Sequence, residues 1–149
     1  MINDTFAMKG DLTITVKDAA TGTIKDQREL KNLVVTAGKG FIASRMAAAS
    51  ASVMGWIAVG TDSTAAAVGN TALGTEVARV ATTVSGGTVS TNTVTYVSTF
   101  PAGTGTGALV EAGIFNASSA GTLLSRTVFS VVNKGAADEM TITWVITVG

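Results

Sequence analysis

Apolar residues alternate with polar ones near both ends of the sequence, and this alternation is the feature that most constrains the fold. Leu12, Ile14 and Val16 alternate with threonine and lysine. Across residues 140–148 five apolar residues alternate in the same way, with threonine at three of the four positions between them. Successive side chains of a β-strand point to opposite faces, so a period of two predicts half-buried strands. Threonine supplies 24 of the 149 residues and suits the solvated face of such strands.

Turn residues divide the rest of the chain into short segments with the composition of strands. Residues 25–31 are highly charged, which predicts a solvated or edge strand that is guarded against pairing with another strand. The turn at 85–88 looks like a hairpin connection between two segments. The expected strands are 12–17, 23–35, 53–59, 75–79, 80–84, 91–100, 108–115, 123–129 and 140–148. Short strands at this spacing predict a mainly β protein, a single-domain antiparallel β-sandwich or jelly roll over residues 1–149.

The alternating pattern also predicts a core between two sheets. Trp144, Ile142 and Ile146 share one face of the last strand and are expected to point inward. The aromatic residues expected beside them are Trp56, Tyr96 and Phe129.

One short helix is expected near residues 37–49. Phe41, Ile42 and Met46 fall on one side at helical spacing and are followed by alanines. Gly38 and Gly40 weaken the first turn, so the start of this helix is the least certain boundary of the prediction.

The absence of cysteine fits a protein made in a reducing cytoplasm, and the charge and hydropathy of the chain bear on its partners. Ten basic and ten acidic residues cancel, so no overall field attracts nucleic acid or anionic lipid. The first ten residues hold no apolar segment typical of a cleaved signal peptide. The apolar run 53–59 is much shorter than the ~20 residues that span a bilayer. We therefore expect neither a nucleic-acid partner nor a membrane.

No charged residue occurs between Val80 and Val110. An uncharged, β-rich stretch of this length favours aggregation if it is exposed. The fold therefore either buries these strands on both faces or leaves them to be covered by another copy or another protein.

The chain contains no histidine and no cysteine. Histidine is the usual proton-transfer group near neutral pH, and cysteine is the readiest nucleophile and soft metal ligand. Serine and threonine therefore lack their usual activating base. A serine–lysine pair stays conceivable, although no motif indicates one. We expect no catalytic, cofactor-binding or metal-binding residues and no small-molecule substrate.

Two loop motifs suggest binding sites but fit local structure better. The sequence Gly38-Lys39-Gly40 lacks the spacing of a phosphate-binding loop, and glycine stands where that motif requires serine or threonine. Asp62 could be one calcium ligand, but the nearest other acid in the sequence is Glu76. We interpret the first motif as a strand-to-helix turn and Asp62 as the first residue of an Asx turn.

The acidic residues allow a weak alternative of glycoside hydrolysis. Asp138 and Glu139 are adjacent, so a strand would point them to opposite faces, and a second acid would have to come from Glu111 or Asp11. Glu111 could instead form an ion pair with Arg126 across a hairpin, contributing about 0.2–1 kcal/mol. We expect solvated carboxylates and a structural ion pair.

Several motifs in a fixed order resemble small structural proteins of tailed bacteriophages. The resemblance covers roughly residues 31–148. Its segments are Lys31-Asn-Leu-Val-Val35, Ile57-Ala-Val-Gly-Thr61, Thr71-Ala-Leu-Gly-Thr-Glu76, Glu111-Ala-Gly-Ile-Phe-Asn116, Gly121-Thr-Leu-Leu-Ser-Arg126 and Met140-Thr-Ile-Thr-Trp144. The motifs are short and rich in common residues.

This resemblance implies a β-sandwich virion component without catalytic activity. A single domain of this size favours a capsid cement, or decoration, protein that forms symmetric homo-oligomers on the major capsid protein. A tail, baseplate or fibre-attachment component is the alternative, and an enzyme of unknown type is a distant third. The loops 60–74 and 101–107 are the expected contact segments, because their small residues allow close backbone approach.

Overall fold

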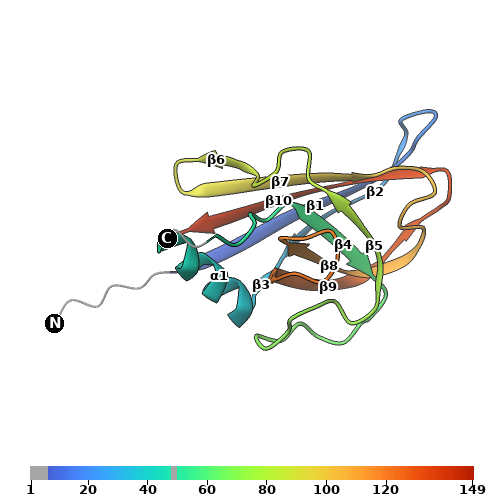
Figure 1. Ribbon diagram of the computed structural model, residues 1–149. Helices are drawn as coiled ribbons and strands as arrows, with labels where there is room; N and C mark the ends of the chain where they lie inside the picture. Colours follow the sequence, from blue (N-terminus) through green and yellow to red (C-terminus); the bar gives the residue numbers. More distant parts are fainter. Residues whose placement is uncertain (1–6, 48–49) are drawn as a thin grey trace.

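The computed structural model describes residues 7–47 and 50–149, and these residues form two five-stranded antiparallel sheets and one helix (Figure 1). The strand order is β2-β1-β10-β7-β6 in the first sheet and β3-β9-β8-β4-β5 in the second. The first sheet comprises β1 (Met8–Asp18), β2 (Ile24–Lys31), β6 (Thr88–Ser90), β7 (Thr93–Phe100) and β10 (Asp138–Val148). The second comprises β3 (Leu33–Val34), β4 (Trp56–Gly60), β5 (Glu76–Ala81), β8 (Gly107–Phe115) and β9 (Leu123–Lys134). The predicted β-sandwich is confirmed.

The two most regular alternating segments pair with each other at the centre of the first sheet. Strands β1 and β10 run antiparallel without a register shift over their whole length, with Leu12 opposite Trp144 and Ile14 opposite Ile142. All four side chains are at most 2% exposed, whereas the threonines between them lie on the outer face. The alternation therefore placed both strands and their buried faces correctly.

The core lies between the two sheets and contains most of the aromatic residues expected there. Trp144 is fully buried, and Tyr96 and Phe129 belong to the same cluster. Trp56 does not join this cluster. It begins β4 and packs on the outer side of the second sheet, because Ile57 takes the inward position of that strand.

The predicted hairpin around residues 85–88 is wrong. Strand β5 belongs to the second sheet and β7 to the first, so the chain crosses between sheets there. The hairpin at this place joins β6 to β7 instead, with Ser90 opposite Thr93. Glycines favour a sharp change of direction, but they do not determine which sheet receives the next strand.

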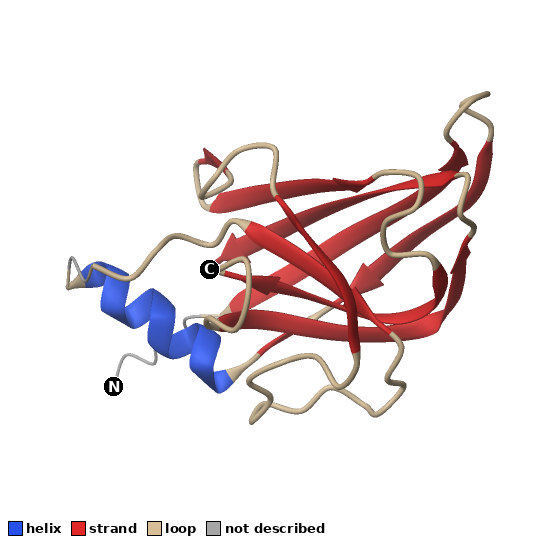
Figure 2. Ribbon diagram, turned by 45° about the vertical axis from the view of Figure 1, so that its right-hand side comes forward, coloured by secondary structure: helices blue, strands red, loops and turns tan. Residues whose placement is uncertain are grey.

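Helix α1 (Thr36–Met46) lies at one end of the sandwich (Figure 2) and confirms the predicted element. Its expected last residue, Ala49, lies outside the described residues. Phe41 and Ile42 pack against the core, but Met46 is 89% exposed, so the predicted apolar side of the helix includes one residue too many.

Both explanations of the uncharged stretch 80–110 apply in part. Tyr96, Phe100 and Leu109 are buried in the core. Val84 and Val89 are at least half exposed, and Val89 lies in β6 at the free edge of the first sheet. Part of this stretch is thus available to a neighbouring molecule.

We predict that Trp144→Ala lowers the free energy of unfolding by about 3–5 kcal/mol, because a large buried side chain leaves a cavity. Urea unfolding followed by circular dichroism measures the change. Trp144→Phe should cost much less, since the ring volume is largely kept and the Trp144 Nε1 donor has no protein partner to lose. The exposed Val89→Ala is the control. Equal stability of the Trp144→Ala and control variants would contradict the central role of Trp144.

Candidate functional site

The acidic residues considered for catalysis do not form a shared site. Asp138 is buried and pairs with Lys25 at 2.6 Å, whereas Glu139 pairs with Lys17 at 3.1 Å. Asp11 lies seven positions along the β1–β10 register from Asp138, about 23 Å for extended strands. In the part of the chain that the structure describes, no group of three or more histidine, cysteine or acidic side chains could hold a metal ion. No helix of that part is long and apolar enough to cross a membrane.

The Gly38-Lys39-Gly40 motif forms the first turn of α1, where the helix packs against β9. Gly38 is buried, and a Cβ atom there would overlap the carbonyl oxygen of Leu124. Close packing of helix and strand therefore accounts for this glycine, and Lys39 is exposed. This agrees with the interpretation as a strand-to-helix turn.

The most elaborate polar arrangement is centred on Glu111 and Arg126, which are both almost completely inaccessible to solvent. Arg126 Nη2 lies 2.9 Å from Glu111 Oε2, and Arg126 Nε donates to the same oxygen at 3.0 Å. The predicted pair is therefore confirmed. Its burial was not predicted, and it changes the energetics, because a buried charge that loses its partner is far costlier than an exposed one.

Glu111 also holds both ends of the long loop between β4 and β5. Its Oε1 accepts hydrogen bonds from the backbone N–H groups of Asp62 at 3.1 Å and Thr75 at 2.8 Å, and its Oε2 accepts one from Gly74 at 2.9 Å. One buried carboxylate thus fixes three backbone donors of a loop that would otherwise be free to move. We call residues 61–75 the strap.

Arg126 holds the middle of the strap. Its Nη1 donates to Asn70 Oδ1 at 3.1 Å, and its Nη2 lies 3.6 Å from the Asp62 carboxylate. The other oxygen of Asp62 accepts hydrogen bonds from the Thr64 N–H at 2.9 Å and the Thr64 hydroxyl at 2.8 Å. This is the predicted Asx turn. The hydrogen bonds from Thr64 are the main cause that lowers the pKa of Asp62.

A small apolar layer lies between the strap and the outer face of the second sheet. Leu73 of the strap packs with Val35, Phe115 and Leu123, and Trp56 covers the edge of this cluster. The Thr36 N–H donates to the Val68 carbonyl at 2.8 Å, which ties the strap to the start of α1. The strap is therefore anchored by apolar contacts as well as by charge.

Arg79 fixes the neighbouring turn at residues 117–120. Its guanidinium lies 3.7 Å from the centre of the Phe115 ring and pairs with Glu76 at 2.7 Å. Its Nη1 donates to the carbonyls of Ala117 and Ala120 at 2.8 and 2.9 Å. Sequence reasoning missed this role, and the only available signal was an arginine three residues after a glutamate in a short, otherwise apolar segment.

The second predicted contact loop, 101–107, is held by Lys134 at the end of β9. The buried Lys134 ammonium donates to the carbonyls of Pro101 at 3.0 Å and Asp138 at 2.6 Å, and desolvation lowers its pKa. The Gly103 N–H donates to the Ala136 carbonyl at 2.9 Å. Both predicted contact loops are therefore fixed to strands by buried charged side chains.

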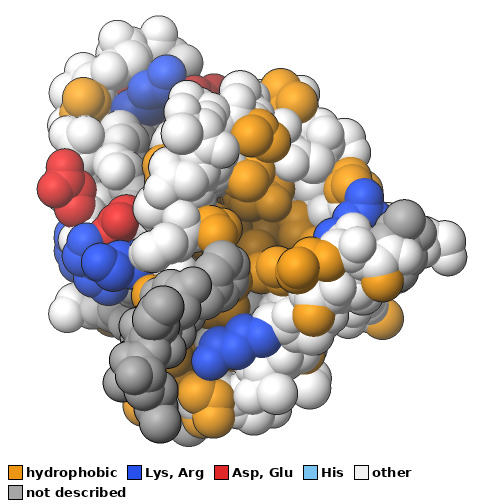
Figure 3. All heavy atoms as spheres, turned by 90° about the vertical axis from the view of Figure 1, so that its left-hand side faces the viewer, with side chains coloured by type: hydrophobic (Ala, Val, Ile, Leu, Met, Phe, Trp, Pro, Cys, Tyr) orange, Lys and Arg blue, Asp and Glu red, His pale blue; other side chains and the backbone are white. Residues whose placement is uncertain are grey.

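An apolar groove of about 600 Å³ lies where α1 meets the beginnings of β1 and β3. Met8, Leu33, Ile42 and Met46 line it, with Lys39 beside them. Figure 3 shows hydrophobic side chains gathered around a hollow on this end of the molecule. Exposed apolar surface of this kind is typical of contact sites between proteins.

The arrangement as a whole presents surfaces rather than reactive groups. Buried charges hold the strap and the 101–107 loop in fixed conformations, and small side chains cover the outside of the strap. A fixed backbone with small side chains can approach a partner closely and loses little conformational entropy when it binds. This geometry fits protein–protein contact.

We predict that Glu111→Gln lowers the free energy of unfolding by about 3–5 kcal/mol, because Arg126 is then left buried without its counter-charge. Limited proteolysis should cut the strap in this variant before it cuts the rest of the chain. Chemical denaturation and mass spectrometry of the fragments measure the two effects.

Two variants serve as comparisons for Glu111→Gln. Glu139→Gln breaks a partly exposed pair and should cost less than about 1 kcal/mol. The double variant Glu111→Gln with Arg126→Met should be more stable than Glu111→Gln alone, because no unpaired charge stays buried. A double variant less stable than the single one would contradict this account.

We predict that the stability contributed by Asp138 depends on pH. The hydrogen bond from Lys25 is the main cause that lowers the pKa of Asp138 below its ordinary value of 3.8. The folded state therefore favours the charged carboxylate, so this contribution is complete above pH 3.8 and is lost as the pH falls through the lower folded pKa. Asp138→Asn should thus be less stable than the wild type at pH 7, and the difference should shrink in acid. Asp11→Asn is the control, and a difference independent of pH would contradict the assignment.

Comparison with known proteins gives no match from which a function could be inferred. No protein-family model matches the chain, and no curated protein or solved structure matches it. The strap, the 101–107 loop and the apolar groove therefore provide the basis for assigning a function.

Proposed function

We propose that this protein is a structural component of a bacteriophage virion, namely a capsid cement protein that binds and stabilises the assembled shell. Its partner is the major capsid protein, which it contacts non-covalently as a symmetric homo-oligomer assembled in the host cytoplasm. The protein acts without catalysis, cofactor or small-molecule substrate. The order of motifs across residues 31–148 supports this proposal, since it resembles that of tailed-phage structural proteins.

The strap is the observation that carries the proposal. It is a loop of mostly small residues whose conformation is fixed by the buried Glu111–Arg126 pair. The same pair could have been replaced by apolar residues if stability alone were required. A fixed and largely exposed strap is suited to fit repeatedly against identical sites on a shell.

The apolar groove and the exposed Val68 support the same role. Val68 on the strap is 54% exposed, although its carbonyl is bonded to α1. The centres of stable protein interfaces are apolar and poor in charge. We therefore place Val68 near the centre of the capsid contact.

We predict that capsids carrying this protein resist heat and low salt better than capsids lacking it. Binding to the assembled shell and not to its dissociated subunits shifts the equilibrium toward the shell. Purified particles with and without the protein are compared by thermal release of their DNA. Equal resistance would overturn the cement function.

Matched variants connect this effect to the strap. Val68→Lys should fold normally but lower the occupancy of capsids, because a charge enters an apolar contact. Val84→Lys, at a similarly exposed position outside the strap, is the control.

The ratio of this protein to the major capsid protein in virions distinguishes a cement protein from a tail or baseplate component, since a tail or baseplate component would be present in few copies. Absence from the virion would exclude both.

A further inference from the structure

Strand β2 is an edge strand whose charges are complementary to themselves when the strand is reversed. Only β1 lies beside it in the sheet. Gln27 is at the centre of the pattern, and residues at equal distances on either side of it are either both apolar or opposite in charge. These pairs are Ile24 with Leu30, Lys25 with Glu29, and Asp26 with Arg28.

The backbone of β2 directs the matching residues toward the free edge. In antiparallel pairs the N–H and C=O groups of alternate residues point to opposite sides of the strand. The Asn32 N–H donates to Gly10 of β1, and the Lys31 carbonyl points the other way and accepts the Thr127 hydroxyl at 2.7 Å. The register with β1 is regular from Asp26 to Lys31, so the backbone groups of Gln27 and Glu29 also point to this edge, which β9 covers only at Lys31 through Thr127.

We propose that β2 pairs with the same strand of a second copy, antiparallel about a two-fold axis at Gln27. This inference rests on the homo-oligomer of the proposed function and specifies its contact. Gln27 then lies opposite the partner's Gln27, Lys25 opposite the partner's Glu29, and Asp26 opposite the partner's Arg28. The first sheets of two molecules become one continuous ten-stranded sheet, and the two-fold axis uses each charge pair twice.

The charges specify this one register. Charged edge strands usually prevent pairing, because like charges opposite each other are destabilising. A shift by one position places Asp26 opposite the partner's Glu29, or Lys25 opposite the partner's Arg28. A shift by two positions places Arg28 or Asp26 opposite its own copy. Only the register centred on Gln27 places an opposite charge beside each of these four residues.

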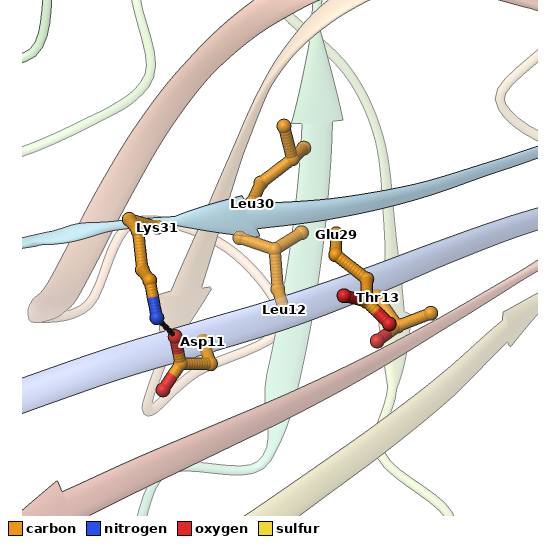
Figure 4. Close-up of a pocket in the computed structure, with 6 residues that line it drawn as sticks. All are labelled: Asp11, Leu12, Thr13, Glu29, Leu30 and Lys31. Carbon is orange, nitrogen blue, oxygen red and sulfur yellow. Dashed lines mark hydrogen bonds and ion pairs between the residues drawn. The ribbon is translucent and has the colours of Figure 1, made fainter.

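The single molecule leaves one of these charges without a counter-ion. Among the described residues, Glu29 is the only charged residue of β2 outside an ion pair. In Figure 4, Glu29 lies beside Thr13, and Lys31 points toward Asp11. Leu12 and Leu30 point to the opposite face of the sheet. Glu29 is thus exposed on the outer face, where the partner's Lys25 would lie.

Arg28 can take part without losing its present contacts, whereas Lys25 has to turn. The Lys25 ammonium pairs with Asp138 of β10, on the far side of β1, and its side chain is 48% exposed, so it can exchange this contact for the partner's Glu29. Arg28 pairs with Asp26 at 3.0 Å and donates to the carbonyls of Ser130 and Val131. Two Asp26–Arg28 pairs related by the axis would form a four-charge cluster.

Sedimentation equilibrium of the full chain over a range of concentrations tests the pairing. We expect a reversible dimer for the wild type. Glu29→Lys places lysine opposite the partner's Lys25 twice in each dimer and should raise the dissociation constant about tenfold or more. Glu139→Lys, a charge reversal in β10 away from this edge, should leave the dissociation constant unchanged.

Mixing two variants separates a specific pairing from a general effect of charge. Lys25→Glu also loses the ion pair with Asp138, so circular dichroism first checks that it folds. The folded variant should dimerise poorly by itself, because it faces the partner's Glu29. An equimolar mixture of Lys25→Glu and Glu29→Lys should form heterodimers with the affinity of the wild type, since every opposed pair is then complementary. A monomeric wild type, an unchanged Glu29→Lys or a mixture that stays monomeric would each overturn the proposal.

The backbone contact is tested by Gln27→Pro, which removes the N–H at the axis and none of the hydrogen bonds to β1. It should weaken the dimer, whereas Gln27→Thr should not, and circular dichroism checks that both fold. A dimer unaffected by Gln27→Pro would overturn the pairing.

The dimer and the cement function are tested separately. Sedimentation equilibrium contains no capsid, so a monomeric protein would overturn the β2 pairing without deciding whether the protein stabilises capsids. Loss of capsid binding would in turn overturn the cement function without deciding whether the protein dimerises.

Discussion

The buried pair of Glu111 and Arg126 is the interaction on which the outer layer of the second sheet depends. Removing two charges from water is costly, and the cost is offset here only because nearly every polar atom of the pair has a partner. Glu111 accepts hydrogen bonds from three backbone N–H groups of the strap as well as from Arg126. These hydrogen bonds fix the strap in one conformation, and they also offset the cost of burying the ion pair. The strap and the ion pair therefore stabilise each other and form one cooperative unit.

The sequence allowed the sheets to be predicted where a local pattern reports the environment directly. The alternation around Ile14 and Trp144 reflects two faces of different polarity, and the structure pairs these two segments residue by residue. Prediction failed where the outcome depends on distant parts of the chain. Glycines near residue 86 indicated a turn but could not show that the chain crosses to the other sheet. Met46 had the spacing of a buried helical residue, but it is the last residue of α1 and is 89% exposed.

The candidate site was predictable in its parts and not in its assembly. Residues 60–74 were recognised as a loop, Asp62 as an Asx turn and Glu111 with Arg126 as a pair, all from local sequence or strand order. Their combination depends on contacts between residues 36 to 61 positions apart, such as those that join Arg126 to Asn70 and Ala65. No local periodicity records contacts of that range. The strap is what covers the pair, and no local pattern in the sequence indicates that cover. From the sequence alone, the expected contribution of the Glu111–Arg126 pair to stability is therefore that of an exposed cross-strand pair.

The chain uses its few charges for two different physical purposes. Inside the molecule, Arg126 and Lys134 fix loops by satisfying carbonyl and carboxylate oxygens away from water. At the surface, five of the twenty charges are concentrated between Lys25 and Lys31 on one edge strand. The opposite edge of the same sheet, β6, has no charge and only three residues, which is too short to guide the pairing of another strand. A long edge needs charges to determine its partner and register, whereas a short edge is protected by its length. This difference between the two edges is why we propose β2, and not β6, as the strand that pairs with a second copy.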